Sequence, residues 1–186
     1  MKKAVFLLVT AIMAVFLTNC TSVSVSPENV AEGKLFTGYK GDYDSSKPIE
    51  EQCILINLTS RRVSRYGVNY TRITKIDGKK WSNFWTSHFI ILQSGTHKID
   101  FFCFDEYRRD RKSYTANPSI TYNFEAGNIY FVEGSMVGMN VSISIANLSD
   151  YESVRVHKSY LGAEEMVMPV PLVIQGIKNA IKSGLK

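Results

Sequence analysis

The chain is poor in the residues from which catalytic centres are usually built. It has 186 residues but only three histidines and three cysteines. It contains no GxSxG elbow, HExxH motif, phosphate-binding loop or GxGxxG sequence. Its 22 basic side chains exceed the 17 acidic ones only slightly, whereas nucleic-acid-binding proteins concentrate a basic stripe. We therefore expect a protein that is not an enzyme and that binds no nucleic acid, cofactor or metal ion.

Long apolar runs are also scarce, and the one that exists lies at the N-terminus. Residues 4–17 are uncharged and follow Lys2 and Lys3. The run is shorter than the about 20 residues that a membrane-spanning helix needs, and its length and basic flank are typical of a secretory signal peptide. We expect residues 1–19 to be removed, which lowers the net charge from +5 to +3 and leaves about 165 residues, enough for one domain.

The apolar run ends in Leu17-Thr18-Asn19-Cys20, which resembles the lipobox of bacterial lipoproteins. The resemblance implies diacylglycerol on the Cys20 sulfur, cleavage before Cys20, and an acyl chain such as palmitate on the new amine. Asn19 departs from the small residue that is usual there, and an ordinary signal peptide cut a few residues later is the alternative. The residue after the lipidated cysteine is Thr21 rather than Asp. Under the rule that sorts lipoproteins in well-studied two-membrane bacteria, this favours the outer membrane. Periplasmic and surface-facing display both stay open.

Two cysteines remain after lipidation of the first. Export to an oxidising compartment permits a disulfide between Cys53 and Cys103, while two buried free thiols are the alternative. Isolated cysteines without CxxC spacing or clustered histidines make no zinc site.

Residue patterns divide the mature chain into three parts. Residues 20–48 are rich in Ser, Gly, Asp and Lys, which predicts a lipidated tether, although Leu35 and Phe36 offer an apolar pair that can dock on the domain. Residues 49–150 show β patterns, and residues 151–186 form an extension with a helix expected near 172–184. That helix has an apolar stripe that includes Val173 and Ile177.

Short strands separated by turn signals predict an antiparallel β-sandwich. Two hairpins are expected, one over residues 86–104 around Gly95 and one over residues 120–133 around Ala126-Gly127. The first is apolar on both faces, so we expect the C-terminal helix to pack across Ile90, Leu92, Phe102 and Phe104 or a neighbouring part of the sheet. The alternative lays that helix on an anionic bilayer.

Three short segments carry a further resemblance. Ile76-Asp77-Gly78-Lys79, Gly95-Thr96-His97-Lys98-Ile99 and Glu125-Ala126-Gly127-Asn128-Ile129-Tyr130 are similar to signatures of PEGA-type repeats and a related lipoprotein-associated domain of unknown function. The resemblance implies a PEGA-like or transthyretin-like sandwich that serves as an accessory module without catalytic residues. Residues 79–85 depart from this family pattern, because they are large and aromatic where the family usually has small residues.

The remaining candidates are surfaces. Trp81, Phe84 and Trp85 form an aromatic patch that suits sugars or partner proteins, or else caps the core. Basic loops near residues 61–65 and 108–112 are solvated faces or sites for anionic lipids and wall polymers. We expect His97 to make a structural hydrogen bond. A hydrolase site built from His88 and Asp100 is a distant third hypothesis.

These observations favour a lipid-anchored, non-catalytic binding or assembly module of the bacterial cell envelope, attached to the membrane through Cys20. Its partner would be an envelope protein or a cell-wall glycan. The alternative is a carbohydrate- or peptidoglycan-binding protein that uses the Trp81, Phe84 and Trp85 patch.

Overall fold

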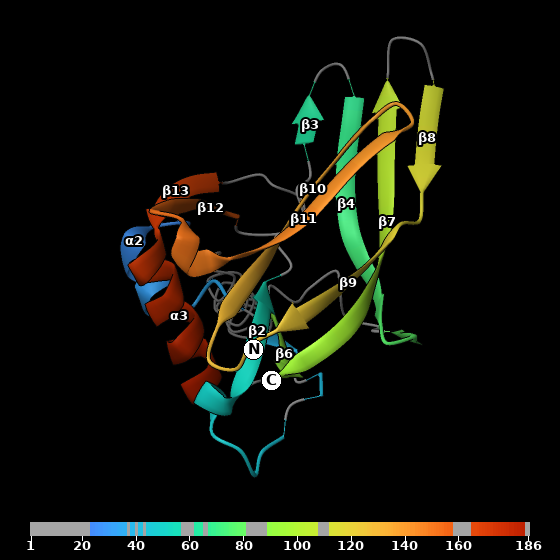
Figure 1. Cartoon of the computed structure of the whole chain (residues 1–186). Helices are drawn as coiled ribbons and strands as arrows, with labels where there is room; N and C mark the ends of the chain where they lie inside the picture. Colours follow the sequence, from blue (N-terminus) through green and yellow to red (C-terminus); the bar gives the residue numbers. More distant parts are fainter. Residues whose placement is uncertain are drawn as a thin grey trace, which may run out of the picture.

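The fold is mainly β and ends in a helix, as the sequence predicts (Figure 1). The computed structural model describes residues 23–36, 38–39, 41–42, 44–56, 62–64, 67–80, 89–107, 112–157 and 165–184. The predicted signal peptide and Cys20 lie outside these residues.

Two large sheets make up most of the domain. The first has the strand order β1 (Gly38–Tyr39), β6 (Phe89–Gln93), β2 (Gln52–Ile56), β10 (Ile129–Val137) and β11 (Asn140–Asn147). The second has the order β3 (Arg62–Ser64), β4 (Gly67–Ile76), β7 (Gly95–Tyr107) and β8 (Lys112–Ala116), with β5 (Lys79–Lys80) on β4 and β9 (Ser119–Phe124) on β7. The second sheet is antiparallel. The first is mixed, because β1 runs parallel to β6 and β2 parallel to β10, which corrects the expectation of purely antiparallel pairing.

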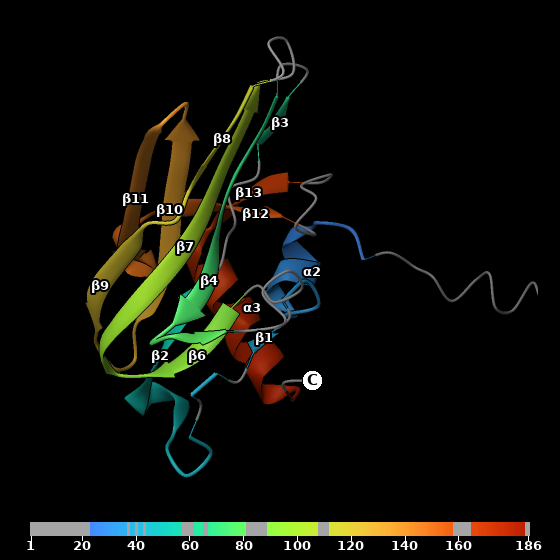
Figure 2. The same cartoon turned by 90° about the vertical axis from the view of Figure 1, so that its right-hand side faces the viewer.

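The two sheets stack face to face around an apolar core (Figure 2). Buried side chains of the first sheet, such as Leu55 and Leu92, meet side chains of the second, such as Ile73 and Phe101. Strand β11 alternates, with Val141, Ile143 and Ile145 turned toward this core and the serines between them exposed.

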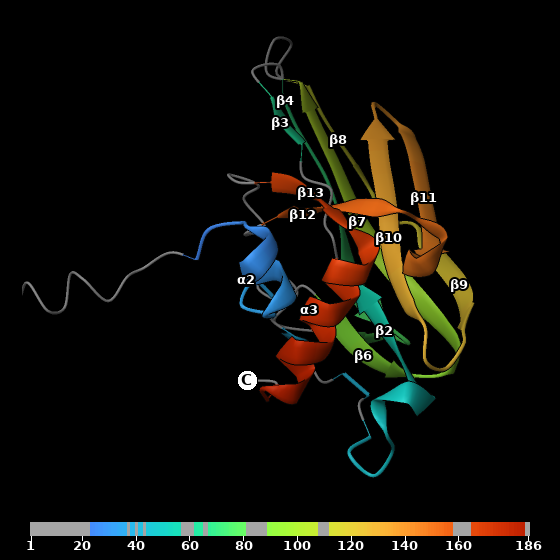
Figure 3. The same cartoon turned by 90° about the vertical axis from the view of Figure 1, so that its left-hand side faces the viewer.

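The opposite face of the first sheet is covered by a third layer (Figure 3). That layer contains α2 (Pro27–Ala31), α3 (Val170–Lys182), the two-stranded sheet β12 (Ser153–His157) and β13 (Glu165–Pro169), and the short 3-10 turn η2 (Leu148–Asp150). Another 3-10 turn, η1 (Ile49–Glu51), leads into β2. Strand β2 is buried along its whole length, as expected for a sheet covered on both sides.

Both glycine turns that were expected to close hairpins instead carry the chain from one sheet to the other. Strand β6 belongs to the first sheet and β7 to the second, and β7 begins at Gly95, whose φ is 130°. Strand β9 belongs to the second sheet and β10 to the first, with Gly127 at φ 77° in the turn. A short glycine turn allows either connection, because it fixes a reversal of direction but not the pairing of the strands that follow.

The crossing decides which side chains face the helix. The C-terminal helix docks on the first sheet, but on the face that carries Phe89 and Ile91, while Ile90 and Leu92 point into the core between the sheets. Phe104 belongs to the second sheet, where its ring stacks at 5.1 Å on that of Tyr70. The expected contact of the helix with Ile90, Leu92, Phe102 and Phe104 is therefore wrong, although docking on a neighbouring part of the sheet is correct.

Residues 23–36, which were expected to belong to a lipidated tether over residues 20–48, pack against the domain instead. Ser26 caps α2 by accepting a hydrogen bond from the Asn29 N–H at 3.3 Å, and Val30 is fully buried against α3. The docking of Leu35 and Phe36 is confirmed, since both are buried in the same layer. This segment is part of the folded domain.

The contact between α2 and α3 is close because α3 presents a glycine there. A Cβ on Gly176 would lie 1.9 Å from the Val30 carbonyl oxygen and 2.7 Å from the Phe36 ring. In addition, the Asn179 side chain donates a hydrogen bond to the Ala31 carbonyl at 2.8 Å. The N-terminal and C-terminal segments thus fix each other.

Docking of α3 predicts that Ile177→Asp will strongly destabilise the protein. Ile177 is fully buried, so the substitution removes its apolar contacts and leaves an unpaired carboxylate, a loss of about 4 kcal/mol or more. Lys178→Asp, one residue along on the exposed side of α3, should cost less than about 1 kcal/mol. Chemical denaturation of the lipid-free protein measures both. Equal stability of the two variants would contradict docking.

Candidate functional site

Several residues singled out from the sequence lie outside the described part of the chain. These are Cys20, the aromatic patch of Trp81, Phe84 and Trp85, and His88, together with most of the basic side chains in the two loops. Their roles remain predictions. The described candidates are the two cysteines, His97 and Asp100.

Cys53 and Cys103 are free, buried thiols in the core between the sheets. The Cys53 thiol donates to the Gln93 carbonyl at 3.3 Å, and the Thr71 hydroxyl donates to the Cys103 sulfur at 3.6 Å. Burial raises the pKa of Cys53 to about 12 and also raises the pKa of Cys103. The disulfide prediction is therefore corrected in favour of its alternative, two small apolar side chains, and such thiols are poor nucleophiles.

His97 makes the structural hydrogen bonds that the sequence suggested. Its Nδ1 lies 2.6 Å from Asp77 Oδ2, and its Nε2 lies 2.9 Å from the Gln93 carbonyl oxygen. Both partners are acceptors, so only a ring with a proton on each nitrogen makes both bonds at once. The ring ties the β4–β5 turn to the place where β6 crosses into β7.

Asp77 is held in place by backbone contacts as well. Its φ of 50° is unusual for a residue other than glycine, and its carboxylate accepts a 2.8 Å hydrogen bond from the Lys98 N–H. Partial burial opposes ionisation, but the hydrogen bonds from His97 and Lys98 outweigh it, so the pKa of Asp77 lies below its usual value. Because these contacts involve every polar atom of the pair, the arrangement is suited to fixing a turn.

Asp100, the other half of the remote hydrolase candidate, accepts a 2.7 Å hydrogen bond from the Ser119 hydroxyl. Among the described residues, no group of three or more His, Cys, Asp or Glu side chains could hold a metal ion. None of the described helices is long and apolar enough to cross a membrane.

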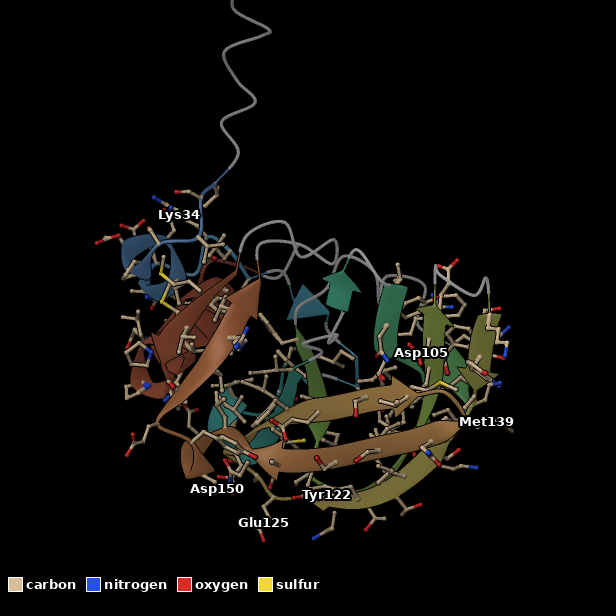
Figure 4. The ribbon with its side chains drawn as sticks, turned by 90° about the horizontal axis from the view of Figure 1, so that it is seen from above. Lys34, Asp105, Tyr122, Glu125, Met139 and Asp150 are labelled. Carbon is tan, nitrogen blue, oxygen red and sulfur yellow. The ribbon has the colours of Figure 1, made fainter. Side chains whose placement is uncertain are left out.

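A buried carboxylate that sequence analysis missed anchors the β10–β11 turn. Asp105 is 6% exposed and accepts hydrogen bonds from the Gly138 N–H at 2.8 Å and from the Asn69 side chain at 3.3 Å. Asn69 also donates to the Met136 carbonyl. Figure 4 shows Asp105 near the turn that carries Met139. The only signal in the sequence is an acidic residue that follows the apolar run of β7.

An aromatic cluster holds the second crossing, between β9 and β10. The rings of Phe124 and Tyr130 meet edge to face at 5.0 Å, and the Tyr130 hydroxyl accepts a 3.0 Å hydrogen bond from the Glu125 N–H. Burial, followed by the neighbouring Tyr130, Asp150 and Glu125 charges, raises the pKa of Tyr122. This phenol therefore stays neutral at ordinary pH and closes the core beside the turn.

The described part of the chain begins close to Cys20. Val25 is buried in the helical layer only five residues after Cys20. Five residues span at most about 18 Å. A lipid on Cys20 would consequently hold the α2–α3 side of the domain close to a membrane, without a long spacer.

Comparison of the chain with protein-family models, curated proteins and solved structures finds no significant match. The resemblance to PEGA-type domains stays a prediction made from three short motifs.

The thiol assignment predicts the outcome of alkylation. In the Cys20→Ala protein, denaturation without reductant should expose both remaining thiols, and intact-mass analysis should show two alkyl groups per chain. The native protein should react far more slowly, because Cys53 and Cys103 are both fully buried. An unreduced, denatured protein that takes up no alkyl group would contain a disulfide instead.

The Asp77 contacts predict a pH-dependent contribution to stability. A carboxyl whose pKa is lowered by folding stabilises the native state above its unfolded pKa, and this contribution is lost as pH falls through the folded value. Asp77→Asn tolerates the positive φ but lacks the charge. The melting temperature of the wild type should exceed that of Asp77→Asn at about pH 6, and the gap should shrink toward about pH 3. A gap independent of pH would refute this role.

Proposed function

We propose that this chain is a lipid-anchored protein of the bacterial cell envelope, whose domain acts as a non-catalytic binding or assembly module. The observation that carries the proposal is Leu17-Thr18-Asn19-Cys20 at the end of an export signal. In this proposal Cys20 becomes the acylated N-terminus, and Thr21 directs the protein to the outer membrane.

The geometry of the N-terminal segment supports an anchor of this kind. Residues 23–36 fold against α3 rather than forming a spacer, so the lipid and the domain are joined over a short distance. Two or more acyl chains bury enough methylene groups, at about 0.8 kcal/mol each, to hold a protein stably on a bilayer. The anchored module would thus have a defined membrane-facing side.

The nature of the described polar clusters supports a binding rather than a catalytic role. His97, Asp77 and Asp105 use their polar atoms to fix turns, and the two described thiols are buried in the core. We further propose that the two stacked sheets belong to the PEGA-like or transthyretin-like class of β-sandwich.

Lipidation predicts that Cys20→Ala will release the protein from membranes. The wild type should incorporate a fatty-acid analogue and enter the detergent phase on phase partitioning, whereas Cys20→Ala should incorporate none and stay in the aqueous phase. The physical reason is the loss of the acyl chains that supply membrane affinity.

Cys103→Ala serves as the matched control, since it removes a cysteine that lies in the core. It should keep both labelling and detergent partitioning. If Cys20→Ala partitions like the wild type, the lipid anchor is disproved.

A further inference from the structure

Among the described residues, the core between the sheets reaches the surface along one side. Apolar side chains that pack against this core but remain partly exposed come, among the described residues, from β8, β9 and β11 alone. They are Tyr114, Ala116, Ile120, Tyr122, Val141, Ile143 and Ile145. Figures 2 and 4 place β9 and β11 on the same side of the molecule. An apolar core that reaches the surface along one side is the pattern of an interaction face.

Strand β11 forms the rim of this open side. It is eight residues long and, among the described strands, pairs with β10 only. Its other edge consequently presents backbone N–H and C=O groups to a further strand. The exposed Met139 and Val137, at 83% and 63%, lie in or beside the turn that leads into it.

The edge of β11 lacks the features that usually prevent pairing. Natural edge strands are protected by charged residues, proline, bulges or short length. Residues 134–149 contain no charged side chain and no proline. The β10–β11 register runs without a shift from the Tyr130–Asn147 pair to the Val137–Asn140 pair. The opposite edge of the same sheet, β1, has only two residues. Of the two edges, β11 is the one built to receive a strand.

The sequence of β11 matches itself in reverse. When two copies lie antiparallel about Ile143, Val141 faces Ile145 and Ile143 faces its own equivalent, so the inward aliphatic row continues across the join. In the same register Ser142 faces Ser144 on the outer side. A two-fold interface brings each residue against the same surface patch of its copy, so a charged strand would meet like charge. The uncharged β11 avoids this.

We propose that β11 pairs antiparallel with β11 of a second copy of this chain, which joins the two five-stranded sheets into one and covers the open side of both cores. The occupant is a second copy because the register is self-complementary and the edge is free of charge. This dimer is independent of the lipid anchor, since its contacts lie on β11 and not on the segment after Cys20.

Cysteine cross-linking tests the register. In the dimer Ile143→Cys faces its equivalent directly, at the about 5 Å Cα separation of opposed residues, which a disulfide can bridge. The full chain with Ile143→Cys, purified in detergent and oxidised, should run as a reducible band of twice the monomer mass. Ile145→Cys is the matched control: its equivalents lie about four residues, or about 13 Å, apart along the strands, so it should remain monomeric on the gel. Val141→Cys combined with Ile145→Cys should cross-link again.

A charge on the edge tests the interface without the cross-link. Ser144→Lys keeps an exposed side chain on the outer side of β11 and should halve the mass measured by sedimentation, while the chain remains folded. Ser135→Lys, exposed one strand further in on β10, should leave the mass unchanged. A wild type that is monomeric at all concentrations overturns the proposal. Equal cross-linking of Ile143→Cys and Ile145→Cys also overturns it.

Discussion

The architecture depends on one constraint: the first sheet is apolar on both faces. Strands β2 and β6 alternate between two cores, so that Ile54 and Ile91 meet the helical layer while Leu55 and Leu92 meet the second sheet. A sheet of this kind cannot leave either face in water without losing about 25 cal/mol for every square ångström of apolar surface. The second sheet covers one face, and α2, α3 and the β12–β13 pair cover the other. The three layers follow from that requirement.

Two of the described polar clusters lie at the crossings between the sheets. At the first, His97 links Asp77 to the Gln93 carbonyl; at the second, the Tyr130 hydroxyl receives the Glu125 N–H. A chain that leaves one sheet for another loses ladder hydrogen bonds, and buried backbone groups need replacement partners. The side chains supply them. This explains why the described polar clusters lie at turns and not around a cavity.

The same architecture gives the molecule two distinct ends. The helical layer receives the segment that follows Cys20, so a membrane anchor there would hold this side toward the bilayer. The edge of β11 and the partly covered core lie on a different part of the surface, formed by the two sheets. The proposed anchor and the proposed strand pairing therefore use separate elements, and neither requires the other.

The sequence by itself determined the mainly β fold and the C-terminal helix, because each depends on local periodicity. It could also indicate a hydrogen-bonding role for His97. Only the tertiary structure decided that Gly95 and Gly127 begin crossings and not hairpins, since a turn fixes direction but not the partner of the next strand. Tertiary packing also decided which face of β6 meets α3, and it placed the free thiols of Cys53 and Cys103 in the core between the sheets. Residues 23–36 belong to the fold because Val30 packs against Gly176. These two residues lie far apart in the chain, so no local pattern in the sequence indicates their contact.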